Sequence, residues 1–152
     1  MRFRIQDSNA ILLFDLMYRP EEYSFDVEPK PQSGGSSLLV NDLQLEVDDD
    51  GRIIYVWGLC PYHAWSEKSL NVPCARSGAL MVDIPDDLVP GISIRITRER
   101  WPVAVDRRSG WVRLGSDEAG DEAIEFAPGS IALLSDGRLV SLWLHPCSLP
   151  DP

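Results

Sequence analysis

The sequence predicts an all-β protein, either an antiparallel β-sandwich or a partly open β-barrel built from hairpins. Asp50-Gly51 and Asp136-Gly137 each separate two apolar runs, and Asp-Gly between such runs is typical of tight β-hairpin turns. Several further short apolar runs follow at the spacing of antiparallel strands. Because no stretch carries apolar residues at helical spacing over three turns, we expect helical structure to be limited to single turns.

The size of the chain predicts one globular domain over residues 1–152. With 152 residues, of which 44% are hydrophobic, the chain can bury a core of its own. No apolar run approaches the ~20 residues that a membrane-spanning helix needs, and the first apolar stretch is not followed by a signal-peptide cleavage site. We therefore expect a cytoplasmic protein without a membrane segment.

The first third of the chain predicts one strand and one loop. Residues 11–18, "ILLFDLMY", are apolar on both alternating faces apart from Asp15, which is typical of a central strand covered on both sides. A buried Asp15 would need a partner such as Arg4 or Arg52, and a structural pair is favoured over a catalytic role. Residues 19–37 contain four acidic residues, three prolines and a Gly-Gly-Ser-Ser end, which predicts a long, mobile loop.

The clearest strand pattern is a hairpin over residues 43–59. Leucine and valine alternate with polar residues up to the Asp50-Gly51 turn, and a β-branched and aromatic strand returns. A second hairpin is expected over 130–145. The two hairpins share Asp-Gly-Arg and a tryptophan at a constant offset, 143 − 57 = 86, and independent use of the same turn chemistry is favoured over duplication. Other strands are expected at residues 79–84, 92–97, 103–106, 111–115 and 124–126.

The net charge of −10 argues against general binding to nucleic acid, which depends on basic residues. The same charge would steer the protein toward a basic protein partner. Residues 95–113 are the exception, with six arginines against Glu99 and Asp106, interleaved with Trp101 and Trp111. A solvated hairpin face is favoured for this segment over a site for a phosphate or a base.

The cysteine and histidine residues follow Trp57 and Trp143, and they are Cys60, His63, Cys74, His145 and Cys147. Their spacing is compatible with a tetrahedral zinc site if the two segments leave the sheet at the same end. A disulfide between Cys60 and Cys74 is another alternative. Proline follows both Cys60 and His145, so plain strand ends are the favoured interpretation. We therefore expect no cofactor, with zinc as the alternative.

Known enzymatic motifs are missing from the sequence. It contains no G-x-S-x-G, no phosphate-binding loop ending in Gly-Lys-Ser or Gly-Lys-Thr, and no H-E-x-x-H. Cys60 and His63 lie three residues apart and are the candidate pair of cysteine nucleophile and base. We therefore do not expect an enzyme.

The candidate interaction residues are an aromatic anchor and an acidic loop. Trp65 lies in the polar stretch "HAWSEK", which predicts an exposed anchor for a partner. The loop over 116–123 supplies the acidic residues Asp117, Glu118, Asp121 and Glu122. A small acidic β protein of this kind is similar to the immunity and inhibitor proteins that neutralise basic toxic enzymes. The alternatives are a small zinc-binding β domain that uses the cysteine and histidine residues, and a module that binds a sugar or a nucleotide through Trp65 or the segment 95–113.

Overall fold

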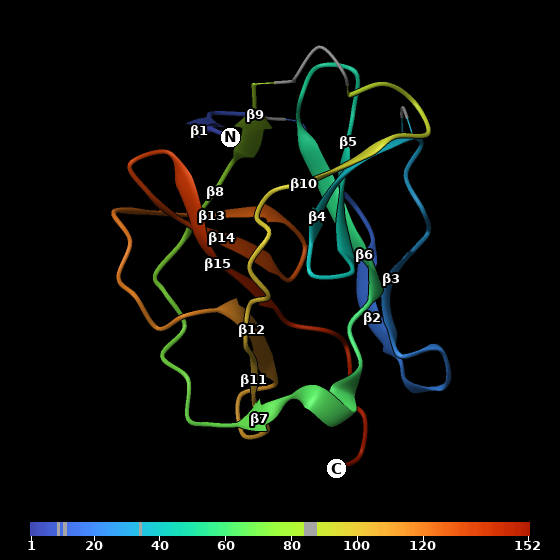
Figure 1. The fold of residues 1–152 in the computed structure, drawn as a ribbon, viewed down its shortest axis with the longest axis vertical. Coiled ribbons are helices and arrows are strands. Elements are labelled where there is room, and N and C mark those ends of the chain that lie inside the picture. The colour runs from blue at the N-terminus through green and yellow to red at the C-terminus, as the bar shows by residue number, and fades with distance from the viewer. Residues whose placement is uncertain (9, 11, 34, 84–87) are drawn as a thin grey trace.

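Two large open β-sheets form most of the computed structural model, which describes residues 1–8, 10, 12–33, 35–83 and 88–152 (Figure 1). The six-stranded sheet has the order β10 (Ser93–Arg95), β4 (Ser36–Val40), β5 (Leu43–Val47), β6 (Ile53–Leu59), β3 (Ser24–Glu28) and β2 (Asp15–Arg19). The seven-stranded sheet has the order β7 (Ser66–Glu67), β11 (Val103–Asp106), β12 (Trp111–Gly115), β15 (Arg138–Leu144), β14 (Ser130–Ser135), β13 (Glu122–Ala127) and β8 (Arg76–Ser77). A small third sheet pairs β1 (Phe3–Gln6) with β9 (Ala79–Val82).

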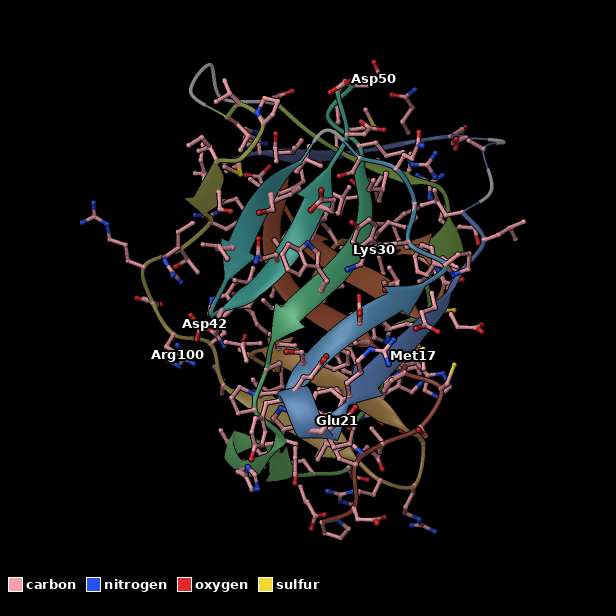
Figure 2. The ribbon with its side chains drawn as sticks, turned by 90° about the vertical axis from the view of Figure 1, so that its right-hand side faces the viewer. Met17, Glu21, Lys30, Asp42, Asp50 and Arg100 are labelled. Carbon is pink, nitrogen blue, oxygen red and sulfur yellow. The ribbon has the colours of Figure 1, made fainter. Side chains whose placement is uncertain are left out.

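The core lies between the two large sheets. Figure 2 looks onto the six-stranded sheet, with the seven-stranded sheet behind it. Leu45 and Val56 of the first sheet, and Leu114 and Leu142 of the second, are fully buried in one hydrophobic cluster. The only helical elements among the described residues are the short 3-10 turns η1 (Pro20–Glu22) and η2 (Tyr62–Ala64). The all-β prediction is therefore confirmed, and the open strand orders show that the fold is not a closed barrel.

No helix in the described part of the chain is long and apolar enough to span a bilayer.

Both predicted hairpins are present. In the β5–β6 pair, Leu45 faces Val56 across the ladder, and Gly51 at the turn has a φ of 87°. In the β14–β15 pair, Asp136 and Gly137 have φ angles of 50° and 75°. Two successive positive φ angles match the twist of the flanking strands, which explains the use of Asp-Gly at this turn.

The prediction of a central strand over residues 11–18 is wrong, because β2 is an edge strand that begins at Asp15. Leu13 is 78% exposed and Asp15 is exposed, so Asp15 needs no buried partner. Leu16 and Tyr18 of β2 are buried in the core. The C-terminal segment covers the open edge of the strand, where the Cys147 amide donates to the Leu16 carbonyl at 2.9 Å. Covering an edge in this way protects unpaired backbone groups. Residue 11 lies outside the described residues.

The prediction of one long loop over 19–37 is also wrong, because this segment contains regular structure. It contains η1 and the whole of β3, whose Phe25 and Val27 are buried and alternate with polar residues. Asp26, between them, accepts ion pairs from Arg19 and Lys30, each at 3.3 Å. The connection without regular structure is therefore shorter than the sequence suggested.

The expected antiparallel pairing holds for most neighbours, but three short pairings are parallel: β10–β4, β11–β7 and β13–β8. The strand predicted over 92–97 is shorter, at Ser93–Arg95. The strand predicted over 79–84 forms from 79 to 82, and residue 84 lies outside the described residues.

Candidate functional site

The five cysteine and histidine residues do not gather around one point. All five are described, and among the described residues no three His, Cys, Asp or Glu side chains are placed to hold one metal ion. The three cysteines are free, with Cys60 buried and Cys74 and Cys147 exposed. The alternative of a Cys60–Cys74 disulfide and the convergence of all five residues are therefore wrong, and zinc binding stays a prediction.

The two segments that follow the tryptophan strands nevertheless reach the same end of the molecule. The Tyr18 hydroxyl donates to the Cys60 carbonyl at 2.7 Å, and the Cys147 amide donates to the Leu16 carbonyl at 2.9 Å. Strand β2 therefore contacts both segments, and Figure 1 shows η2 and the C-terminus at one end. The side chains diverge, because the His145 ring stacks on Trp111 with centroids 4.8 Å apart.

Three aromatic rings, those of Tyr23, Tyr62 and His63, gather at this end and are here called the ring stack. The Tyr62 and His63 rings are stacked with centroids 4.1 Å apart, and the Tyr62 and Tyr23 rings are stacked at 5.9 Å. Tyr23 and His63 complete the triangle at 5.4 Å. The rings come from two turns that lie far apart in sequence, so the stack is a tertiary feature.

The backbone of the two turns brings the rings together. Tyr23 ends η1 in the left-handed conformation, with a φ of 54°, and its amide donates to the Pro20 carbonyl. The Cys60 amide donates to the Tyr23 carbonyl at 2.8 Å. This bond joins η1 to the end of β6, from which Pro61 leads directly into η2. The ring stack is therefore fixed by both turns.

Tyr18 supports the ring stack from beneath. Its side chain is 6% exposed, and its hydroxyl donates to the Cys60 carbonyl and accepts from the Tyr62 amide at 3.1 Å. Its ring makes edge contacts with Tyr62 and Trp65. Burial raises the pKa of the Tyr18 hydroxyl well above its ordinary value, so the group stays neutral and can donate. Burial likewise raises the pKa of Cys60 to about 12, which keeps this thiol protonated near neutral pH.

The exposed anchor is not Trp65, as the sequence predicted. Trp65 is only 9% exposed, and its ring packs against Tyr18 and Phe25 with centroids 4.9 Å and 6.0 Å away. The exposed apolar residues at this end are Tyr23, which is 42% exposed, and Leu59, which is 50% exposed. The sequence analysis predicted neither Tyr23 nor Leu59 as an exposed residue. The position of Tyr23 directly after Pro-Glu-Glu could have indicated its exposure, but nothing in the sequence distinguished Leu59 from the buried residues of its strand.

The surroundings of the ring stack are acidic. Glu21 and Glu22 precede Tyr23 in the chain and are exposed, and Figure 2 shows Glu21 at the lower end of the molecule. Six of the fourteen basic residues form ion pairs with carboxylates of the described residues. They are Arg2, Arg19, Lys30, Arg76, Arg100 and Arg107. The net charge of −10 comes from the excess of 24 acidic residues over these fourteen.

The predicted acidic loop is exposed but lies elsewhere. Asp117, Glu118, Asp121 and Glu122 are all exposed, between β12 and β13 and at the start of β13. Figure 1 shows this connection along the side of the seven-stranded sheet, away from η2. The Asp121 carboxylate accepts the Asp136 amide at 3.0 Å, so it also stabilises the β14–β15 turn. The acidic loop and the ring stack are therefore two separate surfaces.

The arginines of residues 95–113 are dispersed by the fold. Arg95 donates to the Asn41 carbonyl at 2.7 Å, and Arg107 pairs with Glu67. Arg113 is 8% exposed and lies over the Trp143 ring, 5.7 Å from its centroid. These three arginines are therefore engaged by other protein groups, which does not favour a continuous positive groove for a nucleic-acid backbone.

No protein-family model matches the sequence, and no curated protein resembles it significantly.

Proposed function

We propose that this chain is a non-enzymatic interaction protein, of the inhibitor or immunity type, that binds a basic partner protein through the ring stack and Leu59. The observation that carries the proposal is the pair of exposed apolar residues, Tyr23 and Leu59, on a fixed support beside carboxylates. Aromatic residues in such positions dominate the energy of many interfaces.

The fixed geometry of the ring stack supports this function. Tyr18 and the Tyr23–Cys60 backbone bond hold the two turns together before any partner arrives. A surface that is already ordered loses little conformational entropy on binding. The exposed Tyr23 ring also suits the stacking of a lysine or arginine side chain, which contributes about 0.5–2 kcal/mol depending on its desolvation.

The charge of the protein supports a basic partner over an acidic one. Long-range attraction between the −10 charge and a basic surface would speed association, and would weaken as salt shortens the screening length. Glu21 and Glu22, next to Tyr23, would lie at the rim of the interface. Charges at a rim mainly change the rate of association.

Co-purification from the native source tests the function. We expect one basic protein to elute with this chain at fixed stoichiometry, and its rate of association to fall as salt is raised. A variant in which Glu21 and Glu22 are neutralised should still bind the partner but associate with it more slowly. This result would agree with a position of the two residues at the rim. Isolation of a partner that is acidic, or of no partner under any salt condition, would contradict the proposal.

A further inference from the structure

A cavity away from the ring stack lies beside the β14–β15 hairpin of the seven-stranded sheet. It has a volume of about 540 Å³, within the usual range for small-ligand sites. One wall is the segment 96–102, here called the strap, which leads from β10 of one sheet to β11 of the other. The opposite wall comes from the loop after β12 and from the β14–β15 hairpin. In Figure 1 the strap is the yellow segment that descends from β10 toward β11.

The strap is fastened at both ends, and at its start the Ile96 amide donates to the Leu39 carbonyl at 2.9 Å. The Asn41 side chain accepts from the Trp101 amide at 2.8 Å and donates to the Trp101 carbonyl at 3.0 Å. The Gly115 amide donates to the Pro102 carbonyl at 2.9 Å. Trp101 is half-buried, packs against the core and also lines the cavity. The wall of the cavity therefore includes a tryptophan whose backbone is held by hydrogen bonds within the protein.

The charged groups of the cavity wall balance one another. Glu99 and Glu118 supply two carboxylates, and Arg100 and Arg138 supply two guanidinium groups. Arg100 is already paired with Asp42 at 3.3 Å, as Figure 2 shows at the β4–β5 turn. The side chains of Glu99, Glu118 and Arg138 make no hydrogen bond to the described residues. The charged side chains of this wall therefore carry no net charge, which gives a phosphate or a nucleotide little advantage over a neutral ligand.

The same wall offers both kinds of hydrogen-bonding partner to a neutral ligand. Carboxylates only accept and guanidinium groups only donate, whereas a hydroxyl group does both. A ring that carries several hydroxyl groups can satisfy Glu99, Glu118 and Arg138 together, and its C–H face can pack on Trp101. We propose that this cavity binds a neutral saccharide unit, with Trp101 against one face of the sugar ring and these three charged side chains on its hydroxyls. This inference does not depend on the protein-binding function.

Saturation-transfer NMR with the whole protein tests the site. The probes are the methyl glycosides of glucose, galactose, mannose and N-acetylglucosamine, with maltose and lactose as disaccharides. We expect saturable binding of at least one probe, with a dissociation constant on the order of 1 mM. Absence of saturable binding for every probe would overturn the proposal, and so would tighter binding of glucose 6-phosphate than of methyl glucoside.

Variants locate the binding. Trp101→Ala should weaken it roughly tenfold or more because the stacking face is lost. Trp111→Ala is the control, because Trp111 is also half-buried but stacks on His145 outside this cavity. Glu118 is exposed, so Glu118→Ala should keep the fold. We expect this variant to weaken binding as well, and it tests the site if Trp101→Ala does not fold. Binding that neither Glu118→Ala nor a folded Trp101→Ala weakens would refute the site.

A final comparison separates the two sources of such a ring. We compare binding of the protein to a glycoprotein and to the same glycoprotein without its glycan. Preference for the glycosylated form would identify a glycan as the ligand, whereas binding of the free glycosides alone would identify a free sugar. Both results support a saccharide site. Equal binding of the two protein forms, together with no binding of the glycosides, would contradict it.

Discussion

Replacing Tyr18 by phenylalanine removes the atom that fastens η2 to β2. The Tyr18 hydroxyl donates to the Cys60 carbonyl at 2.7 Å and accepts from the Tyr62 amide at 3.1 Å. Because the side chain is 6% exposed, water has little access to replace the lost hydroxyl. The variant keeps the ring and its edge contacts, so it tests the hydrogen bonds alone.

The magnitude follows from the two bonds. Each contributes about 1 kcal/mol net, and a buried group left without a partner costs about 1–3 kcal/mol more. The bond to the Cys60 carbonyl is buried, whereas the Tyr62 amide is half-buried and can regain water in part. We therefore expect Tyr18→Phe to lower the free energy of unfolding by about 2–4 kcal/mol.

Urea unfolding followed by tryptophan fluorescence measures this loss. With a slope of about 1–3 kcal/mol per molar urea, the midpoint should fall by roughly 1–2 M. Tyr62→Phe is the matched control, because the Tyr62 hydroxyl makes no hydrogen bond to the described residues and its loss should change stability by less than about 0.5 kcal/mol. Equal midpoints for the two variants would refute the supporting role of Tyr18.

Three further predictions concern the strap, the buried thiol and the metal alternative. Asn41→Ala should destabilise by about 2–4 kcal/mol in the same urea assay, because it removes both bonds to Trp101 and places alanine at a positive φ; a midpoint equal to that of the wild type would contradict this. The pKa of Cys60 is raised from 9.0 to about 12, so its contribution to stability is complete below pH 9 and is lost as the pH rises toward 12. The stability difference between wild type and Cys60→Ala should therefore shrink over that alkaline range, and a constant difference would argue against a buried thiol. Elemental analysis of untagged protein should find zinc well below one equivalent, and one equivalent would restore the zinc site.

The hairpins could be predicted because their signals are local. Asp136-Gly137 adopts the two positive φ angles that the dipeptide favours, and in β5 the buried Leu43, Leu45 and Val47 alternate with Gln44 and Glu46. The strand β3 carried the same signal, since Phe25 and Val27 alternate with Asp26 and Glu28. The prolines and acidic residues around it obscured this pattern.

Other features depend on contacts between distant residues. The apolar residues of β2 suggested a central strand, and only the bond from Cys147 to Leu16 shows that a later segment covers an edge strand. The polar neighbours of Trp65 suggested exposure, but η2 turns its ring beneath Tyr18. The ring stack joins residues from two turns that no periodicity connects, so it could not be read from the sequence.

The affinity of the basic partner for surface variants tests the central claim most directly. Tyr23→Asn removes a ring and keeps a residue that tolerates the φ of 54°. Leu59→Ser removes the exposed leucine, and Leu13→Ser is its control because Leu13 is 78% exposed outside the ring stack.

In calorimetry with the co-purified partner, we expect Tyr23→Asn and Leu59→Ser each to weaken binding by roughly tenfold or more, the loss usual for central interface residues. Leu13→Ser should bind as the wild type does. Equal affinity for all four proteins would contradict the account that the ring stack and Leu59 form the binding surface.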